Sequence, residues 1–195
     1  MKKTLLYLFA ITAFTACSTP PAKKVVVMAS GKINAAGDVL TYEPGTQHNE
    51  TSINLQGDKL TVKNGSDSKD YPVTEAGTWL LNLQKDTLIG SVQNYGESDS
   101  REGSITQEAL MERMDSLRQL TLGTNVSAAK KNHFLEPGSL KKISAEDNAI
   151  IVGPFKGMPA SLTPGKDGKT PEVYKFITNN DARETLGRLE KMLKQ

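Results

Sequence analysis

A histidine and a glutamate two residues apart are the first pair in this chain whose types could do chemistry. His48 and Glu50 lie in the polar stretch 45–50, for which the sequence predicts a surface turn. An imidazole there could orient a ligand or act as a base with the carboxylate. The alternative is an exposed or capping histidine in a loop. His48 and Glu50 are therefore candidate ligand-binding residues, and we predict no catalytic residue.

Three other short motifs match fragments of phosphate-binding or catalytic sequences. The stretch 163–170 ends like a phosphate-binding loop, but Thr163 stands where the first glycine belongs, and Pro171 follows instead of a helix. Ser66 and Ser139 each precede a lysine by three residues, the spacing of penicillin-binding enzymes. Both serines lie in predicted turns or strands, and the companion motifs are absent. Chance accounts for all three matches.

The composition argues against a metal site and against a nucleic-acid partner. The only histidines, His48 and His133, are far apart in sequence, and neither has a second ligand one helical turn away. Removal of residues 1–16 takes two of the 24 basic residues and no acidic one, which leaves 22 basic and 22 acidic residues. A neutral chain lacks the excess positive charge that binds phosphate backbones. We expect no cofactor, metal ion or nucleic acid.

The N-terminus has the organisation of a secretory signal. Lys2 and Lys3 precede an apolar stretch that is too short to cross a hydrocarbon core of ~30 Å as a helix. It ends in Phe14-Thr15-Ala16-Cys17, which resembles the lipobox of bacterial lipoprotein precursors, with Phe14 in place of the usual leucine. The alternative is an ordinary signal peptide that happens to end near a cysteine.

The lipobox resemblance implies cleavage before Cys17 and several acyl chains on that cysteine. Residues 1–16 would then be the signal peptide and residues 17–24 a lipidated tether. Cys17 is the only cysteine, so disulfides within one chain are impossible. More than one acyl chain gives stable anchoring. We therefore expect a protein of the bacterial cell envelope, anchored to a lipid bilayer and facing the periplasm.

Residues 25–95 predict a β-rich region. The unbroken run 25–28 is typical of a buried strand. Apolar and polar residues alternate on both sides of the turns at 56–59 and 84–86, which predicts two hairpins. The expected strands are 25–28, 39–42, 52–55, 60–63, 78–83 and 87–92.

Residues 96–195 predict strands mixed with two helices, after a loop or linker at 93–104. The first helix spans 106–121, capped by Ser104 or Thr106, and the second spans 180–194, capped by Asn179 or Asn180. Their apolar stripes indicate packing onto a sheet, and a membrane-lying or partner-binding helix is the alternative. The strands are a pair at 140–143 and 149–152, and one at 173–177, which follows a glycine- and proline-rich loop at 157–171.

Two further short stretches resemble known families. The stretch Gly77-Thr78-Trp79 is similar to the Gly-x-Trp that begins lipocalin-like barrels, although it follows several strands here. Residues 151–155, Ile-Val-Gly-Pro-Phe, resemble a strand of the peptidoglycan-binding sporulation-related repeat, but no helix follows directly. We expect an α+β fold: an antiparallel β-rich half, as a small sandwich or barrel, a mid-chain amphipathic helix, and a C-terminal β-plus-helix portion.

The favoured function is a non-enzymatic envelope lipoprotein with a binding or structural role. Its partner would be an envelope protein, a glycan or a cell-wall component. One alternative is a carrier of lipid or another small ligand, and another is an uncharacterised hydrolase. Loops on a rigid scaffold often carry function. The stretch 45–50 and the loop 153–169 are therefore the expected places for a site.

Overall fold

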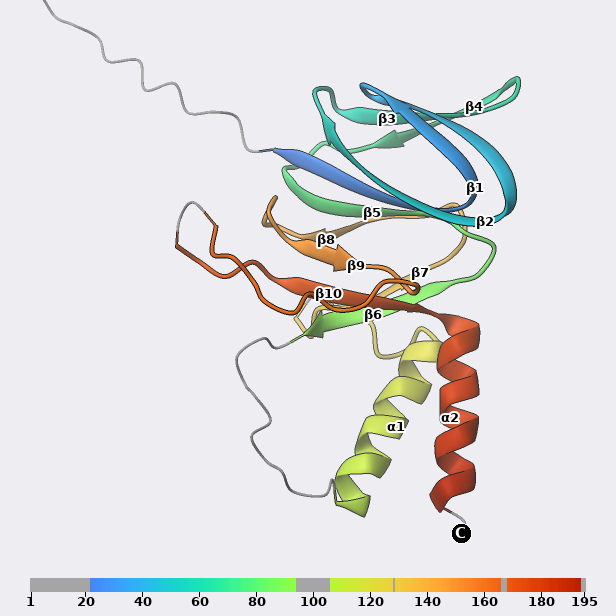
Figure 1. Cartoon of the computed structure of the whole chain (residues 1–195), viewed down its shortest axis with the longest axis vertical. Helices are drawn as coiled ribbons and strands as arrows, with labels where there is room; N and C mark the ends of the chain where they lie inside the picture. Colours follow the sequence, from blue (N-terminus) through green and yellow to red (C-terminus); the bar gives the residue numbers. More distant parts are fainter. Residues whose placement is uncertain (1–21, 94–105, 128, 166–167, 194–195) are drawn as a thin grey trace, which may run out of the picture.

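The chain forms an α+β structure in three layers, which confirms the predicted fold class. The computed structural model describes residues 22–93, 106–127, 129–165 and 168–193. Figure 1 shows a curled sheet at the top, a second sheet beneath it, and helices α1 (Gln107–Thr121) and α2 (Asn179–Leu193) side by side at the bottom. The strands are β1 (Lys23–Ala36), β2 (Val39–Leu55), β3 (Lys59–Asn64), β4 (Asp67–Pro72), β5 (Gly77–Leu83), β6 (Leu88–Gln93), β7 (Asn132–Leu135), β8 (Leu140–Ser144), β9 (Ile150–Val152) and β10 (Val173–Thr178).

The upper sheet, sheet A, is built around β1. Its order is β4-β3-β2-β1-β5-β8, and β1 pairs antiparallel with β2 and parallel with β5. Val25 and Val27 face one core cluster, whereas Val26 and Met28 face another. All four are buried, because both faces of β1 are covered. An unbroken apolar run is what such a strand requires, so the buried strand predicted at 25–28 is confirmed.

Strand β2 curls so strongly that its two ends approach each other. Asp38, in the turn before β2, accepts hydrogen bonds from the backbone N–H groups of Gln56 (2.9 Å) and Gly57 (2.7 Å), which follow the end of β2. On the far edge, the Tyr71 hydroxyl of β4 lies 3.2 Å from the carbonyl oxygen of Gly138, just before β8. Sheet A is therefore a nearly closed, barrel-like layer.

This curl overturns the predicted hairpin between 52–55 and 60–63. β3 pairs in parallel with residues 39–41 at the start of β2, while Leu55 pairs with Lys23 of β1. The two hairpins of sheet A are instead β1–β2 and β3–β4, and β4 was not predicted. Local alternation indicates a strand, but it does not specify which strand will be its partner.

The two other predicted strand pairs are also wrong. β5 lies in sheet A and β6 in the lower sheet, because the buried side chain of Asn82 holds a crossing between the sheets. Its amide nitrogen donates to the carbonyl oxygens of Asp86 and Leu135, both at 2.9 Å, and its oxygen accepts from the Gln84 N–H. Likewise β8 pairs with β5 and β9 with β10, so the segments predicted at 140–143 and 149–152 do not pair together.

The lower sheet, sheet B, lies between sheet A and the helices. Its order is β7-β6-β10-β9, and β7 was not predicted. Leu88 and Phe176 pack toward sheet A, whereas Ile89 and Ile177 pack toward Leu120 of α1 and its neighbours. Two hydrophobic clusters therefore connect the three layers, and a third fills the interior of sheet A.

Both helices form where they were predicted, but one cap differs. Thr106 caps α1, because its hydroxyl oxygen accepts a hydrogen bond from the third backbone N–H beyond it (3.2 Å). Ser104, the other candidate, lies outside the described residues. For α2 the structure places Thr178 in the cap position (3.1 Å), so the prediction of Asn179 or Asn180 is wrong. β10 runs directly into α2, and its last residue therefore becomes the cap.

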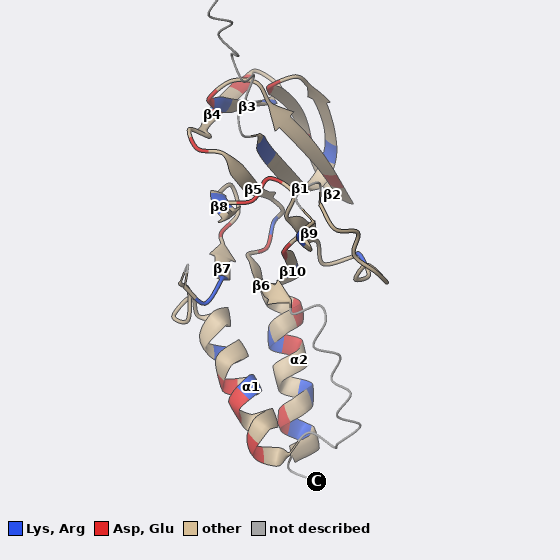
Figure 2. Cartoon of the chain, turned by 90° about the vertical axis from the view of Figure 1, so that its left-hand side faces the viewer, with Lys and Arg blue, Asp and Glu red and all other residues tan. Residues whose placement is uncertain are grey.

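The helices pack onto sheet B at one end and project beyond it at the other. Leu120 and Ala182 are buried against the sheet, which confirms the predicted packing for this part of each stripe. Farther along, the Arg118 guanidinium pairs with Glu190 at 2.7 Å and bridges the two helices. Figure 2 shows acidic and basic residues distributed over both helices.

Candidate functional site

A β-bulge interrupts the pairing of β1 with β2. Ser30 pairs with His48, but Gly31 pairs with Pro44, so residues 45–47 have no partner on β1. Gly31 has φ 134°, and a Cβ there would lie 2.0 Å from a backbone carbonyl oxygen of β2. Only glycine fits this close approach. Extra residues in one strand bend it, and bulges often lie beside functional sites.

The bulge corrects the position predicted for His48. The stretch 45–50 is part of β2 rather than a surface turn, because the bulge accommodates residues 45–47 without ending the strand. His48 is partly buried, with 21% of its side chain exposed. The ring of Phe155 covers it, with 4.4 Å between the two ring centroids.

Both ring nitrogens of His48 have partners. The side-chain nitrogen of Gln84 lies 3.1 Å from Nδ1, and an amide nitrogen can only donate. Nδ1 is therefore the acceptor, and Nε2 carries the proton that is donated to Glu50 Oε1 at 2.8 Å. This assigns a neutral imidazole held in one tautomer. Among the described residues, no hydroxyl or thiol is hydrogen-bonded to either nitrogen.

Glu50 is the more deeply buried member of the pair, with only 5% of its side chain exposed. Its second oxygen pairs with Lys156 Nζ at 2.5 Å. Gly153 packs so closely against it that a Cβ there would lie 1.8 Å from Glu50 Oε1. A carboxylate this buried needs both partners, because desolvation of a charge is costly.

Lys175 of β10 holds the loop that begins at Gly153 from the side of sheet B. Its ammonium group donates to the carbonyl oxygens of Gly153 (2.8 Å) and Lys156 (2.7 Å). Burial lowers the pKa of Lys175, and the nearby charge of Glu50 partly offsets this effect. The loop that begins at Gly153 is therefore attached to both sheets, through Glu50 on one side and Lys175 on the other.

The structure thus joins the two places in which the sequence predicted a site. His48 and Glu50 contact Phe155 and Lys156 of the loop 153–169. We call His48, Glu50, Gln84, Phe155 and Lys156 the His48 cluster. Both nitrogens of His48 and both oxygens of Glu50 have partners within it, so the cluster can position a strand and a loop, and the His48 lone pair is not free to take a proton from a substrate.

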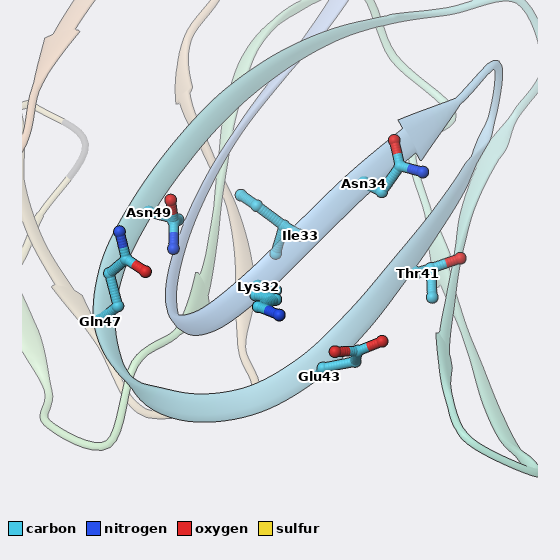
Figure 3. Close-up of a pocket in the computed structure, with 7 residues that line it drawn as sticks. All are labelled: Lys32, Ile33, Asn34, Thr41, Glu43, Gln47 and Asn49. Carbon is cyan, nitrogen blue, oxygen red and sulfur yellow. The ribbon is translucent and has the colours of Figure 1, made fainter.

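A separate polar concavity lies on the other side of β2. Because successive side chains of a strand alternate, Gln47 and Asn49 line this concavity while His48 and Glu50 point into the cluster. It has a volume of about 320 Å³. Figure 3 shows the residues of this concavity, which we call the bulge pocket: Lys32, Ile33, Asn34, Thr41, Glu43, Gln47 and Asn49.

Most polar side chains of the bulge pocket are free. Lys32 stands opposite Glu43 and Asn34 opposite Thr41 in the β1–β2 ladder. Of the polar lining residues, only Asn49 has a hydrogen-bond partner within the described part of the chain, the carbonyl oxygen of Gly31 at 2.7 Å. The remaining groups can therefore bind a ligand without first breaking a bond.

The bulge pocket was not predicted from the sequence. Gly31 and the Pro44-Gly45 pair interrupt the strand alternation around the bulge. The available signal was the pairing of Lys32-Ile33-Asn34 with Thr41-Tyr42-Glu43, in which polar residues flank one apolar residue. Tyr42 is partly buried, its hydroxyl lies 3.0 Å from the carbonyl oxygens of Ser30 and Leu83, and burial raises its pKa.

The remaining predicted site residue, Cys17, lies outside the described residues, as do most of residues 17–24. In the described part of the chain no helix is long and apolar enough to cross a bilayer. The same residues contain no cluster of three or more histidine, cysteine or acidic side chains that could hold a metal ion. The chain matches no protein-family model, no curated protein and no solved structure.

Proposed function

We propose that this protein is a lipid-anchored lipoprotein of the bacterial envelope whose exported part binds a glycan or cell-wall fragment without catalysing a reaction. The observation that carries the binding role is the bulge pocket, where five polar side chains converge and remain unpaired within the described residues. Amides, a hydroxyl, an ammonium and a carboxylate complement sugar hydroxyl groups, which both donate and accept hydrogen bonds.

The His48 cluster supports a non-catalytic role. A general base needs a free lone pair within hydrogen-bond reach of the proton it removes. The Nδ1 lone pair of His48 is occupied by Gln84, and its Nε2 proton by Glu50. In this proposal the cluster holds the curled strand β2 in place, so that Gln47 and Asn49 keep their positions in the bulge pocket.

The anchor part of the proposal rests on the sequence Phe14-Thr15-Ala16-Cys17 and the apolar stretch before it. It is tested by intact mass and detergent partitioning of the full-length protein beside Cys17→Ala, both produced in a Gram-negative host. We expect an acylated mass beginning at Cys17 and partition into detergent, both lost in the variant. An unmodified wild-type protein cut elsewhere would contradict the anchor.

The binding part is tested by calorimetric titration of the detergent-solubilised full-length protein with chitin-derived oligosaccharides and with muropeptides. The double variant Glu43→Ala/Gln47→Ala removes two free groups of the pocket and should weaken binding at least about tenfold. Lys63→Ala, on the exposed end of β3, is the matched control and should bind like the wild type. Equal affinity of the wild type and the double variant, or no binding of either probe, would refute the glycan site.

A further inference from the structure

A second concavity lies where the free edges of the two sheets meet. β8 ends sheet A and β7 ends sheet B, so neither strand has a partner on its outer side among the described strands. Between them is a hollow of about 550 Å³, within the size range of small-ligand sites. We call it the edge pocket; its polar lining includes Lys131, His133, Lys142, Glu146, Glu172 and Tyr174.

One wall of the edge pocket is a preorganised network around Glu172. Its carboxylate accepts hydrogen bonds from the hydroxyls of Ser144 (2.6 Å) and Tyr174 (2.7 Å), and from Lys131. Burial acts to raise the pKa of Glu172, but these three donors outweigh it and hold the pKa below its ordinary value. Glu172 is therefore a fixed negative charge whose own partners keep it in place.

Other groups of the pocket keep hydrogen-bonding capacity. His133 is 8% exposed, and its Nε2 atom is buried without a partner in the described part of the chain. Unpaired buried polar atoms are uncommon and often indicate a missing bound molecule. The Glu146 side chain has no ion pair or hydrogen bond with any described residue, and the ammonium groups of Lys131 and Lys142 each use only one of three protons.

The charges select the class of ligand. Two lysines and two glutamates line the same hollow. A simple anion would be repelled by Glu146 and Glu172, and a simple cation by Lys131 and Lys142. A molecule that carries both charges satisfies both sets, and a neutral imidazole can donate to it or accept from it.

We propose that the edge pocket binds a small zwitterion, an amino acid or short peptide, whose ammonium group pairs with Glu146 and whose carboxylate pairs with Lys142 and Lys131. His133 hydrogen-bonds to the ligand from the inner wall. Glu172 and Tyr174 do not change partners; they keep that wall rigid. This site is independent of the lipid anchor and of the bulge pocket.

The experiment follows the imidazole nitrogen resonances of the full-length, ¹⁵N-histidine-labelled protein in detergent. The chain has only two histidines, and His48→Gln assigns them. The probes, at millimolar concentration, are alanyl-alanine, its N-acetyl form without the amine, its amide without the carboxylate, and a neutral disaccharide. We expect alanyl-alanine alone to shift the His133 resonances, while those of His48 stay unchanged.

Two variants and one control test which charged side chains bind the dipeptide. Glu146→Gln and Lys142→Gln should each weaken binding of alanyl-alanine about tenfold, whereas Glu43→Gln in the bulge pocket should not change it. The proposal is overturned if none of the probes shifts His133, or if the N-acetyl and amide forms bind as tightly as the parent dipeptide. A normal dipeptide response together with failed glycan binding would refute the glycan proposal alone.

Discussion

The two histidines lie in opposite surroundings: His48 contacts the loop 153–169, and His133 lines the edge pocket. His48 is partly exposed, yet both its nitrogens are hydrogen-bonded. His133 is nearly inaccessible, yet its Nε2 atom has no partner among the described residues. Burial lowers the pKa of His133 to about 4, with a smaller contribution from the charge of Lys141.

The difference shows how position in the sheet determines what a histidine can do. At His48, β2 pairs with β1, and Gln84 after β5 together with Phe155 and Lys156 of the loop 153–169 completes the His48 cluster. β7 is an edge strand, so His133 has neighbours on one side and the edge pocket on the other. Exposure alone would rank the two residues the wrong way round as candidates for ligand binding.

The largest effect is expected where the bulge itself is broken. In Gly31→Ala the new Cβ would meet backbone 2.0 Å away at a positive φ, so the free energy of unfolding should fall by about 3 kcal/mol or more. Urea denaturation measures the loss. The control is Gly187→Ala, at an open position inside α2, which should stabilise the protein by roughly 0.5–1 kcal/mol. A Gly31→Ala protein as stable as the wild type would show that the bulge is not required.

The next effect is the cost of protonating His133. Its folded-state pKa of about 4 lies below the ordinary 6.5, so the unfolded chain binds more protons between these values. Stability should therefore be highest above pH 6.5 and fall by roughly 3 kcal/mol as the pH approaches 4. Urea denaturation across this range measures the slope in the wild type and in two variants.

The two histidine variants test whether His133 causes this dependence of stability on pH. His133→Gln should remove most of it, because an amide does not titrate, while the carboxylates that remain continue to titrate below pH 5 in both proteins. His48→Gln, measured in parallel, controls for the removal of an imidazole elsewhere in the chain. The same slope in the wild type and in His133→Gln would show that His133 is not the group responsible.

Loss of the buried carboxylate should have an intermediate effect. Glu50→Gln keeps the shape of the side chain but removes the charge that pairs with Lys156, and should cost about 1–2 kcal/mol. The cost is limited because Lys156 is 59% exposed and can return to water. Glu43→Gln, an exposed position on the same strand, should remain within about 0.5 kcal/mol of the wild type. If both variants lose equal stability, the cluster has no special role.

The smallest effect is expected at the amide that fixes the tautomer. Gln84→Met fills a similar volume but cannot donate to His48 Nδ1, and should cost about 1 kcal/mol or less. The sharper readout is nitrogen NMR, which in the wild type should show His48 protonated on Nε2 alone and in the variant a mixture of tautomers. Lys85→Met, at the exposed neighbour, is the control.

Local patterns predicted most of the elements, β4 and β7 excepted, but not their partners. The run 25–28 and the apolar stripes of the two helices predict which faces of these elements are buried. They do so because the spacing of apolar residues follows the faces that pack against other elements. The partner of a strand depends on distant side chains instead. Asp38 brings the turn after β2 back to its start, and Asn82 directs the chain from one sheet to the other. Nothing adjacent to these two residues in sequence indicates either role.

The candidate sites, like the fold, were predicted only in part. His48, Glu50 and the loop 153–169 were identified as separate places by residue type and loop composition, and the structure joins them. The bulge pocket depends on three residues without partners opposite Ser30 and Gly31, an irregularity that alternation cannot show. The edge pocket depends on β7, which was not predicted, and on its position at a sheet edge.

The central place of β1 also determines how the protein bears mechanical load. The carbonyl oxygen of Ala22 already accepts a hydrogen bond from the Gly77 N–H at 3.0 Å, so pairing begins at the first described residue. A pull on the chain ahead of Lys23, directed along the strand, shears the ladders to β2 and β5 together and cannot peel off one bond at a time. A force applied at the end of the chain that the anchor proposal ties to the membrane is thus shared by two strand ladders at once.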